Sequence, residues 1–358
     1  MTNPVLVELT RGALVESQHR GAVAVARPNG DLVVAMGDVA RPVFPRSAVK
    51  SLQALSLIET GAADRYGFGA HEIALACASH SGTEAHSSLA ADMLARAGLT
   101  DAALGCGAHM PGHEATAHGK IKAGRAPGPL DNNCSGKHSG MLATAVHMKE
   151  AVASYLAPDH PVQQRILKNM REVTGAALAD DVRGIDGCSV PTWAMSLQTL
   201  ATAFARLGSG EGLGPTRRAT VERIMASCWE APEMVAGPGR LDTAILGRLK
   251  GQVFSKTGAE GVYCAALVDR GLGLALKVED GTPRAAQAAL AMIIERLYPS
   301  VGTGRSAASR IGAAPRSARR GARTSSSRRS TDSRRCGKDP PVSVMAGRVA
   351  GCDHMPRA

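Results

Sequence analysis

Strand-forming segments lie near both ends of the first 300 residues, and helical segments fill the sequence between them. Two Val-rich runs flank Pro28-Asn29-Gly30, and an Asn-Gly pair between such runs is a strong signal for a β-hairpin. Three later runs, at 252–256, 261–269 and 272–280, have the spacing of an antiparallel meander. This arrangement predicts an α+β fold in which the terminal strands pair in one antiparallel sheet, flanked by helices and with a mainly helical region inserted between them.

Hydrophobic residues recur at helical spacing in the middle of the chain. We expect helices at 47–60, 83–98, 138–152, 160–174, 191–207 and 216–228, and a closing helix at 282–297. In the helix at 191–207, Pro191 suits the first turn and Gly208 suits the C-terminal cap.

The composition changes after Leu297, where Arg, Ser, Gly and Ala replace the large apolar residues. Such a segment buries too little surface to offset the ordering of its backbone. We expect one folded domain at 1–299 and a basic, low-complexity, disordered tail at 300–358. A solvated tail, an arm that binds nucleic acid or a membrane surface, and translation of a GC-rich gene out of frame are all consistent with this composition.

The formal net charge of +11 resides mostly in the tail. Residues 301–358 hold thirteen Lys or Arg and three Asp, which leaves +1 for residues 1–300, and only 3% of the chain is aromatic. Nucleic-acid binding is therefore expected only through the tail. The sequence has no run of eighteen apolar residues and no unbroken apolar core of a signal peptide, so we expect no membrane partner and a cytoplasmic location.

A serine three residues before a lysine opens the first helical run. Ser47 and Lys50 at this spacing share one helical face, where a lysine with a lowered pKa can act as the general base of the serine. Taken alone, a serine before an apolar run is more often a helix cap. A second motif, Lys256-Thr257-Gly258, follows at the end of a late strand. The two motifs in this order are typical of serine acyl-transfer enzymes of the β-lactamase and penicillin-binding type.

Three further polar clusters lie in turns before predicted helices. Segment 77–88 contains Ser79 and His80 beside glycine, segment 129–142 contains Cys134, Lys137 and His138, and segment 184–197 contains Asp186 and Cys188 at a helix entry. A hydroxyl beside glycine allows a ligand to approach the backbone closely, although such turns also serve simply as helix entries.

Cysteines give only an ambiguous metal signal. The eight cysteines include no CxxC pair, and Cys134 and Cys188 alone lie in polar, turn-rich surroundings. Zinc accepts thiolate ligands, but two cysteines without a histidine at standard spacing do not establish a site.

The segments RSAVKSLQ, ASHSGTEAH, DNNCSGKHSGML, GIDGCSVP and SKTGAEGVYC, in this order, resemble the rhizobial-type (class 3) L-asparaginases over residues 4–296. The resemblance implies a fold similar to serine β-lactamases and glutaminases, a homodimer, and hydrolysis of L-asparagine to L-aspartate and ammonia. It implies two Ser-Lys pairs, Ser47 with Lys50 and Ser79 with Lys256. It also implies a zinc ion held by Cys134, Lys137 and Cys188.

The implied mechanism is a two-step acyl transfer in which Lys50 takes the proton of Ser47 and Ser79 assists proton transfer or holds substrate. The order of the two serines stays open, and we favour Ser47 as nucleophile. The candidate substrate-binding residues are Arg46, His80, His138, Asp186, Arg240 and Asp242.

Two alternative functions stay open. The first is a serine hydrolase similar to β-lactamases or penicillin-binding proteins. The second is a non-catalytic protein on the same scaffold that binds zinc or nucleic acid.

Overall fold

The computed structural model describes residues 2–299 and the backbone of 343–345. The predicted tail at 300–358 therefore lies outside the described residues, apart from one three-residue strand.

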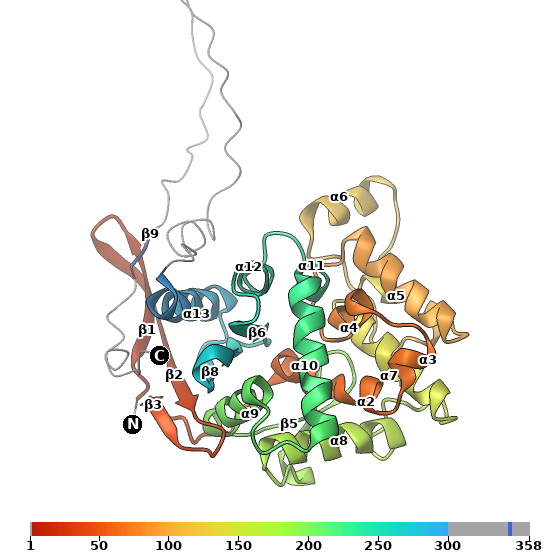
Figure 1. The fold of residues 1–358 in the computed structure, drawn as a ribbon. Coiled ribbons are helices and arrows are strands. Elements are labelled where there is room, and N and C mark those ends of the chain that lie inside the picture. The colour runs from red at the N-terminus through yellow and green to blue at the C-terminus, as the bar shows by residue number, and fades with distance from the viewer. Residues whose placement is uncertain (1, 300–342, 346–358) are drawn as a thin grey trace, which may run out of the picture.

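An antiparallel sheet joins strands from the two ends of the described chain (Figure 1). Its strand order is β6-β7-β8-β2-β1-β9, and β3 also pairs with β2. The strands are β1 (Val5–Arg11), β2 (Leu14–Ala26), β3 (Leu32–Met36), β6 (Val253–Thr257), β7 (Val262–Leu267), β8 (Leu272–Val278) and β9 (Ser343–Met345). Because β2 pairs with both β3 and β8, the predicted hairpin and the predicted pairing of the two chain ends are confirmed, as is the α+β fold class.

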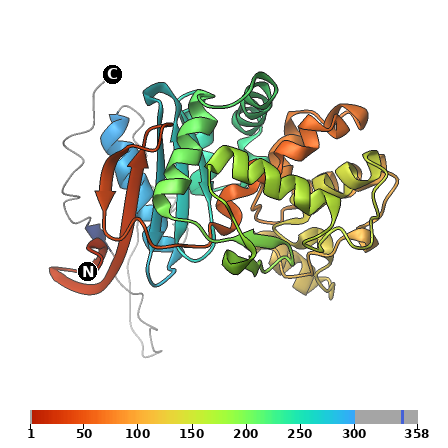
Figure 2. The same ribbon diagram turned by 90° about the horizontal axis from the view of Figure 1, so that it is seen from below.

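The two faces of the sheet are covered by different helices (Figure 2). Alternate residues of β2 point to opposite faces. Val23 and Val25 pack with α13 (Pro283–Leu297), whereas Ala22, Ala24 and Ala26 belong to the core that contains α9 (Leu197–Ser209). A Cβ on Gly273 would lie 1.9 Å from the carbonyl oxygen of Ala201, so this glycine lets α9 pack directly against the sheet.

The remaining elements form a mainly helical region beside the sheet (Figure 1). Apart from the 3₁₀ helix η5 (Val268–Arg270), which connects β7 and β8, they are the 3₁₀ helices η1 (Arg46–Val49), η2 (Asp101–Ala103), η3 (Pro129–Asp131) and η4 (Asp180–Val182), the helices α1 (Lys50–Gln53), α2 (Leu55–Glu59), α3 (Ala62–Arg65), α4 (Ala70–Ala76), α5 (Glu84–Arg96), α6 (Glu114–Lys122), α7 (Ser135–His147), α8 (Pro161–Thr174), α10 (Pro215–Glu230), α11 (Pro232–Val235) and α12 (Leu241–Arg248), and the two-stranded sheet β4 (Arg183–Ile185) and β5 (Pro191–Trp193).

One helix prediction was wrong at its start. Residues 191–193 form β5, and the helix predicted at 191–207 begins only at Leu197. The Ser196 side chain accepts a hydrogen bond from the N–H of Thr199 and so caps α9, while Gly210 rather than Gly208 ends it in the left-handed conformation. Asp186 and Cys188 consequently lie in the β4–β5 turn, not at a helix entry.

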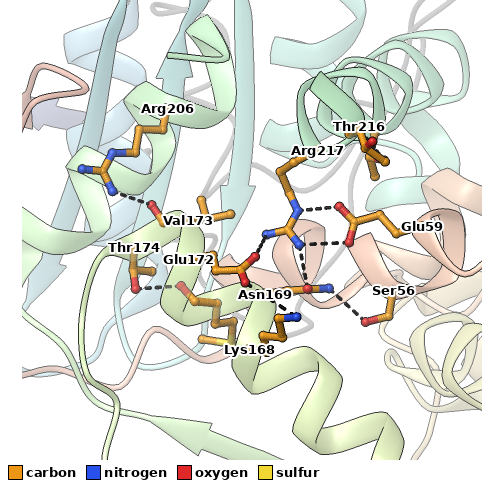
Figure 3. A network of polar contacts seen from close by, with 12 residues as sticks. Ser56, Glu59, Lys168, Asn169, Glu172, Val173, Thr174, Arg206, Thr216 and Arg217 are labelled. Atoms are coloured by element: carbon orange, nitrogen blue, oxygen red, sulfur yellow. Dashed lines mark hydrogen bonds and ion pairs between the residues drawn. The ribbon is translucent and has the colours of Figure 1, made fainter. Parts of the chain in front are cut away.

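Arg217 links three helices of this region (Figure 3). Its guanidinium, on α10, binds Glu59 of α2, and it also contacts two residues of α8. These contacts are a hydrogen bond of 2.8 Å to Asn169 Oδ1 and an ion pair of 3.1 Å with Glu172. The side chain of Arg217 is only 13% exposed, so removing it leaves a partly buried carboxylate without its partner.

We therefore expect Arg217→Ala to lower the free energy of unfolding by about 2–4 kcal/mol, the range seen when one partner of a partly buried pair is removed. Arg218→Ala is the matched control, because Arg218 makes an exposed i, i+4 pair with Glu222 that contributes at most about 0.5 kcal/mol. Urea denaturation of both variants measures the difference. Equal losses in the two variants would contradict this role for Arg217.

Candidate active site

Ser47 lies in the 3₁₀ helix that leads directly into α1. Arg46, immediately before it, has a φ of 52°, a left-handed conformation that non-glycine residues adopt only under constraint. The N–H of Lys50 donates to the carbonyl of Ser47, which fixes the predicted i, i+3 relation between the two residues. The Ser47 side chain is half-buried and, within the described part of the chain, its hydroxyl has no hydrogen-bond partner.

The K-T-G motif of β6 lies against this segment. A Cβ on Gly258 would be 2.6 Å from the carbonyl oxygen of Pro45, so a larger residue would separate the end of β6 from η1. The sequence motifs 47–50 and 256–258 are thus brought together, as their order predicted.

Lys50 does not contact Ser47 through its amine. Its Nζ atom donates to three other acceptors: the carbonyl of Ala78 at 2.5 Å, Ser79 Oγ at 3.1 Å and Cys134 Sγ at 3.1 Å. Three donated hydrogen bonds are the full capacity of an ammonium group. The Lys50 amine is thus directed toward the loop after α4 and Cys134 rather than toward Ser47.

Ser79 connects Lys50 to Lys256. The Nζ atom of Lys256 donates to Ser79 Oγ at 3.0 Å and to the carbonyl of Thr257 at 2.9 Å. Burial lowers the pKa of Lys256 to about 7, with the charges of Lys50 and Arg240 acting in the same direction and that of Asp242 opposing them. The predicted pair Ser79–Lys256 is therefore in contact, and Ser79 lies between two amines.

The backbone around Ser79 is fixed by segments that are distant in sequence. The N–H of Ser79 donates to the carbonyl of Val235, and the N–H of Ser81 donates to that of Ala236. Between them, the N–H of His80 donates to the carbonyl of Asn133. These hydrogen bonds fix the backbone of the loop after α4, and they thereby position the Ser79 hydroxyl between the two lysines.

The three predicted metal ligands converge beside Lys50. Lys137 Nζ is 2.9 Å from Cys188 Sγ, and Cys188 also makes a hydrogen bond with Cys134. This hydrogen bond, with the charges of Lys50 and Lys137, holds the pKa of Cys134 well below its usual range despite burial. The pKa of Cys188 is raised by the same hydrogen bond and by burial. Burial opposes protonation of Lys137, but the charges of Cys134 and Cys188 raise its pKa.

Two sulfur atoms and one amine nitrogen, once deprotonated, would be donors of the kinds that zinc accepts. Among residues 2–299, no group of three His, Cys, Asp or Glu side chains could hold a metal ion. A zinc site in this part of the chain would therefore depend on Lys137.

Arg46 and Asp186 form an ion pair of 2.7 Å at the same site, between η1 and the β4–β5 turn. Burial raises the pKa of Asp186, but the charge of Lys137 and the contact with Arg46 outweigh it and keep that pKa below its usual value. Both residues are partly exposed, so a charged ligand can reach them. Both residues were predicted from the sequence as candidate substrate-binding residues.

His80 and His138 are both buried, with exposed fractions of 2% and 0%. His80 Nδ1 accepts from the N–H of Gly82, so its Nε2–H donates to Ser135 Oγ, and the ring has no free atom for a ligand. His138 shares a hydrogen bond of 2.6 Å with the hydroxyl of Tyr155. Burial lowers the pKa of both rings well below the ordinary value, so both are neutral.

Arg240 and Asp242, the remaining two predicted substrate-binding residues, lie in different surroundings. Arg240 is half-buried at the N-cap of α12 and makes no polar side-chain contact with the described residues. Asp242 is 1% exposed and binds Ser255, Thr257 and Tyr263 behind β6. Sequence reasoning missed Ser255 and Tyr263. The sequence offered one signal for a buried polar contact: the two polar residues Ser255 and Thr257 lie on the same face of β6.

A family model described as L-asparaginase II matches residues 7–328. No curated protein matches the chain. Similar solved structures include a β-lactamase from Mycobacterium bovis, with 12% identity, a TM-score of 0.40 and coverage of 77% of this chain and 94% of that protein. Mglu in its native form has 15% identity, a TM-score of 0.40 and coverage of 78% of this chain and 64% of Mglu.

Proposed function

The chain belongs to the L-asparaginase II family, and from this premise we propose that it hydrolyses L-asparagine to L-aspartate and ammonia by acyl transfer to a serine. The observation that carries the mechanism is the buried series Lys50–Ser79–Lys256 beside Ser47. An amine with a pKa near 7 in this series supplies a base at neutral pH without a histidine.

Ser47 is the attacking residue in this proposal. Ser47 is half-buried and its hydroxyl has no hydrogen bond to the described residues, whereas Ser79 is buried and its hydroxyl is held by two amines. The strained backbone at Arg46 also supports Ser47, because strain of this kind persists where the surrounding structure fixes a side chain for function. Ser79 instead transfers protons between the two lysines.

In this mechanism Lys50 acts as the base in both steps. Lys50 passes a proton through the Ser79 hydroxyl to neutral Lys256, and neutral Lys50 then accepts the proton of Ser47. Ser47 Oγ attacks the side-chain amide carbon of asparagine, and the C–N bond breaks as Lys50 returns the proton to the leaving ammonia. Water then attacks the aspartyl ester with Lys50 again as base, which releases aspartate and restores Ser47.

Arg46 and Asp186 are the proposed contacts for the charged end of the substrate. A guanidinium suits the α-carboxylate of asparagine and a carboxylate suits its α-ammonium group. Binding in this way would replace the ion pair that the two residues make with each other. Arg46 directly precedes Ser47 in η1, and an amino-acid substrate must be anchored near Ser47 for its side-chain amide to reach the hydroxyl.

The test is ammonia release from L-asparagine by the purified full-length chain, with L-glutamine and a chromogenic cephalosporin as parallel substrates. The proposal predicts turnover of L-asparagine in preference to the other two. Hydrolysis of the cephalosporin without ammonia release would favour the rival serine hydrolase. A folded protein that acts on none of them, and that binds nucleic acid in a salt-dependent manner, would favour the non-catalytic alternative.

Zinc is the proposed metal of the cluster formed by Cys134, Lys137 and Cys188. When bound, it would supply a fixed positive charge beside the Ser-Lys series. Zinc would have to displace protons from Lys137 and the thiols, because Lys137 is held protonated by the two sulfurs.

We expect Cys188→Ala to remove nearly all bound zinc from the reconstituted protein, and zinc occupancy of the parent to rise with pH as the ligands lose protons. Elemental analysis after dialysis measures both. Cys264→Ala is the matched control, because Cys264 is a buried thiol of β7 outside the cluster. Equal zinc content in the two variants, or none in the parent, would refute the site.

We also propose the homodimer that the family resemblance implies. Light scattering on the full-length chain tests it, and a monomer at micromolar concentration would contradict it. For the described residues, the structure has no helix long and apolar enough to cross a membrane.

A further inference from the structure

Asp242 has a buried carboxylate that accepts three hydrogen bonds from the strands next to the site. Its Oδ1 atom accepts from Ser255 Oγ at 2.8 Å and from the hydroxyl of Tyr263 at 2.9 Å. Its Oδ2 atom accepts from the backbone N–H of Thr257 at 3.1 Å. The residue is 1% exposed, so these contacts leave it unavailable to a substrate.

Two of the three donors are the immediate neighbours of Lys256 on β6. Successive side chains of a strand point to opposite faces, so Lys256 points toward Ser79 while Ser255 points toward Asp242. The third donor, Tyr263, lies on β7 opposite Thr257. One carboxylate on α12 thus holds the end of β6 on both sides of the lysine.

The carboxylate of Asp242 also contributes negative charge to a site that is otherwise rich in cations. No lysine, arginine or histidine among the described residues forms an ion pair with it. The charged and titratable groups that act on Lys256 are Asp242 and Arg240 from α12, Lys50 from α1, and Cys134 before α7; the thiols of Cys228 and Cys264 also lie within its influence.

We propose that Asp242 is a positioning residue for Lys256: it fixes the end of β6 so that the amine reaches Ser79, and it places a buried negative charge near that amine. The effect on turnover rests on the proposed function, whereas the effect on Lys256 does not. Asp242 acts through Lys256 and does not touch the substrate.

The charge of Asp242 raises the pKa of Lys256, so the effect of removing that charge has a definite direction. Burial lowers the pKa of Lys256 to about 7, and the charge of Asp242 opposes that shift. Asparagine at position 242 retains the shape and one acceptor oxygen but removes the charge and turns an N–H donor toward the N–H of Thr257. The protonated form of Lys256 then loses its main stabilising partner, so its pKa should fall further.

The experiment is an NMR titration of the full-length chain labelled with [¹³C]lysine, in which Lys256→Met identifies the Lys256 signal. We expect Asp242→Asn to lower the titration midpoint of Lys256 by about one pH unit or more. The low-pH limb of the kcat/KM profile for L-asparagine should shift in the same direction. Tyr263→Phe is the matched control: it removes one hydrogen bond, keeps the charge, and should leave the midpoint unchanged.

A folded Asp242→Asn variant with the midpoint of the parent would overturn the proposal. If that variant does not fold, Asp242→Ser, which leaves room for a water molecule beside the same donors, provides the same comparison. The titration requires no substrate. A parent that releases no ammonia would therefore refute the proposed function and leave the titration to decide the role of Asp242.

Discussion

Ser47→Ala is expected to lower kcat for L-asparagine by about 10⁴-fold or more, the scale of loss when a covalent nucleophile is removed. The half-buried hydroxyl has no hydrogen bond to any described residue, so its removal should leave the fold intact. Circular dichroism and thermal unfolding check that point, and a coupled ammonia assay measures kcat.

The matched variant is Ser79→Ala. It breaks the proton route between Lys50 and Lys256 but keeps the nucleophile, so we expect a smaller loss of about 10²–10³-fold, typical of general acid–base catalysis. The reverse order, with Ser79→Ala inactive and Ser47→Ala retaining activity, would assign the attack to Ser79 and contradict the roles proposed here.

Lys256→Met should have the second large effect, a loss of about 10²–10⁴-fold in kcat/KM at pH 8. In the parent, kcat/KM should fall about tenfold per pH unit below a pKa of about 7, because protonated Lys256 accepts no further proton. The Met variant has lost this base, so that limb should disappear from its residual activity. A parent profile that is flat between pH 5 and 8 would contradict the role of Lys256.

Stability provides the control for Lys256→Met. The folded-state pKa of Lys256 lies below its unfolded value, so this lysine destabilises the fold increasingly as pH falls from about 10.5 to about 7, and fully below pH 7. Methionine removes that penalty but leaves Ser79 and the carbonyl of Thr257 without one partner. The variant should therefore be at least as stable as the parent at pH 6, so that its lower activity does not result from unfolding.

The strands could be predicted from sequence because each has a local pattern. The Val-rich runs on either side of the Asn-Gly turn and the evenly spaced runs from 252 to 280 are all strands of the same sheet. Helix α6 had no comparable pattern: it buries none of its residues, so no apolar stripe marks it. The start of α9 was misplaced because Pro191 also fits the first residue of a strand, and the cap at Ser196 was overlooked.

The members of the site could be predicted from their motifs, but their contacts could not. Spacing on one helix placed Lys50 beside Ser47, yet the long side chain of Lys50 reaches the loop after α4 and Cys134 instead. That loop is fixed by residues 235–236 and 133, which no local pattern connects to it. Asp242 shows the same limit, because only the packing of α12 on β6 reveals that its carboxylate is buried.

The most direct test of a Ser-Lys acyl-enzyme is to locate the ester. Full-length protein mixed with L-asparagine is quenched in acid within the first turnovers, and its peptides are mapped by mass spectrometry. The mechanism predicts one aspartyl group on Ser47 in the parent, accumulating further in Lys256→Met if loss of the base slows the water step more than ester formation. An aspartyl group on Ser79, or ammonia release with no ester on either serine, would contradict it.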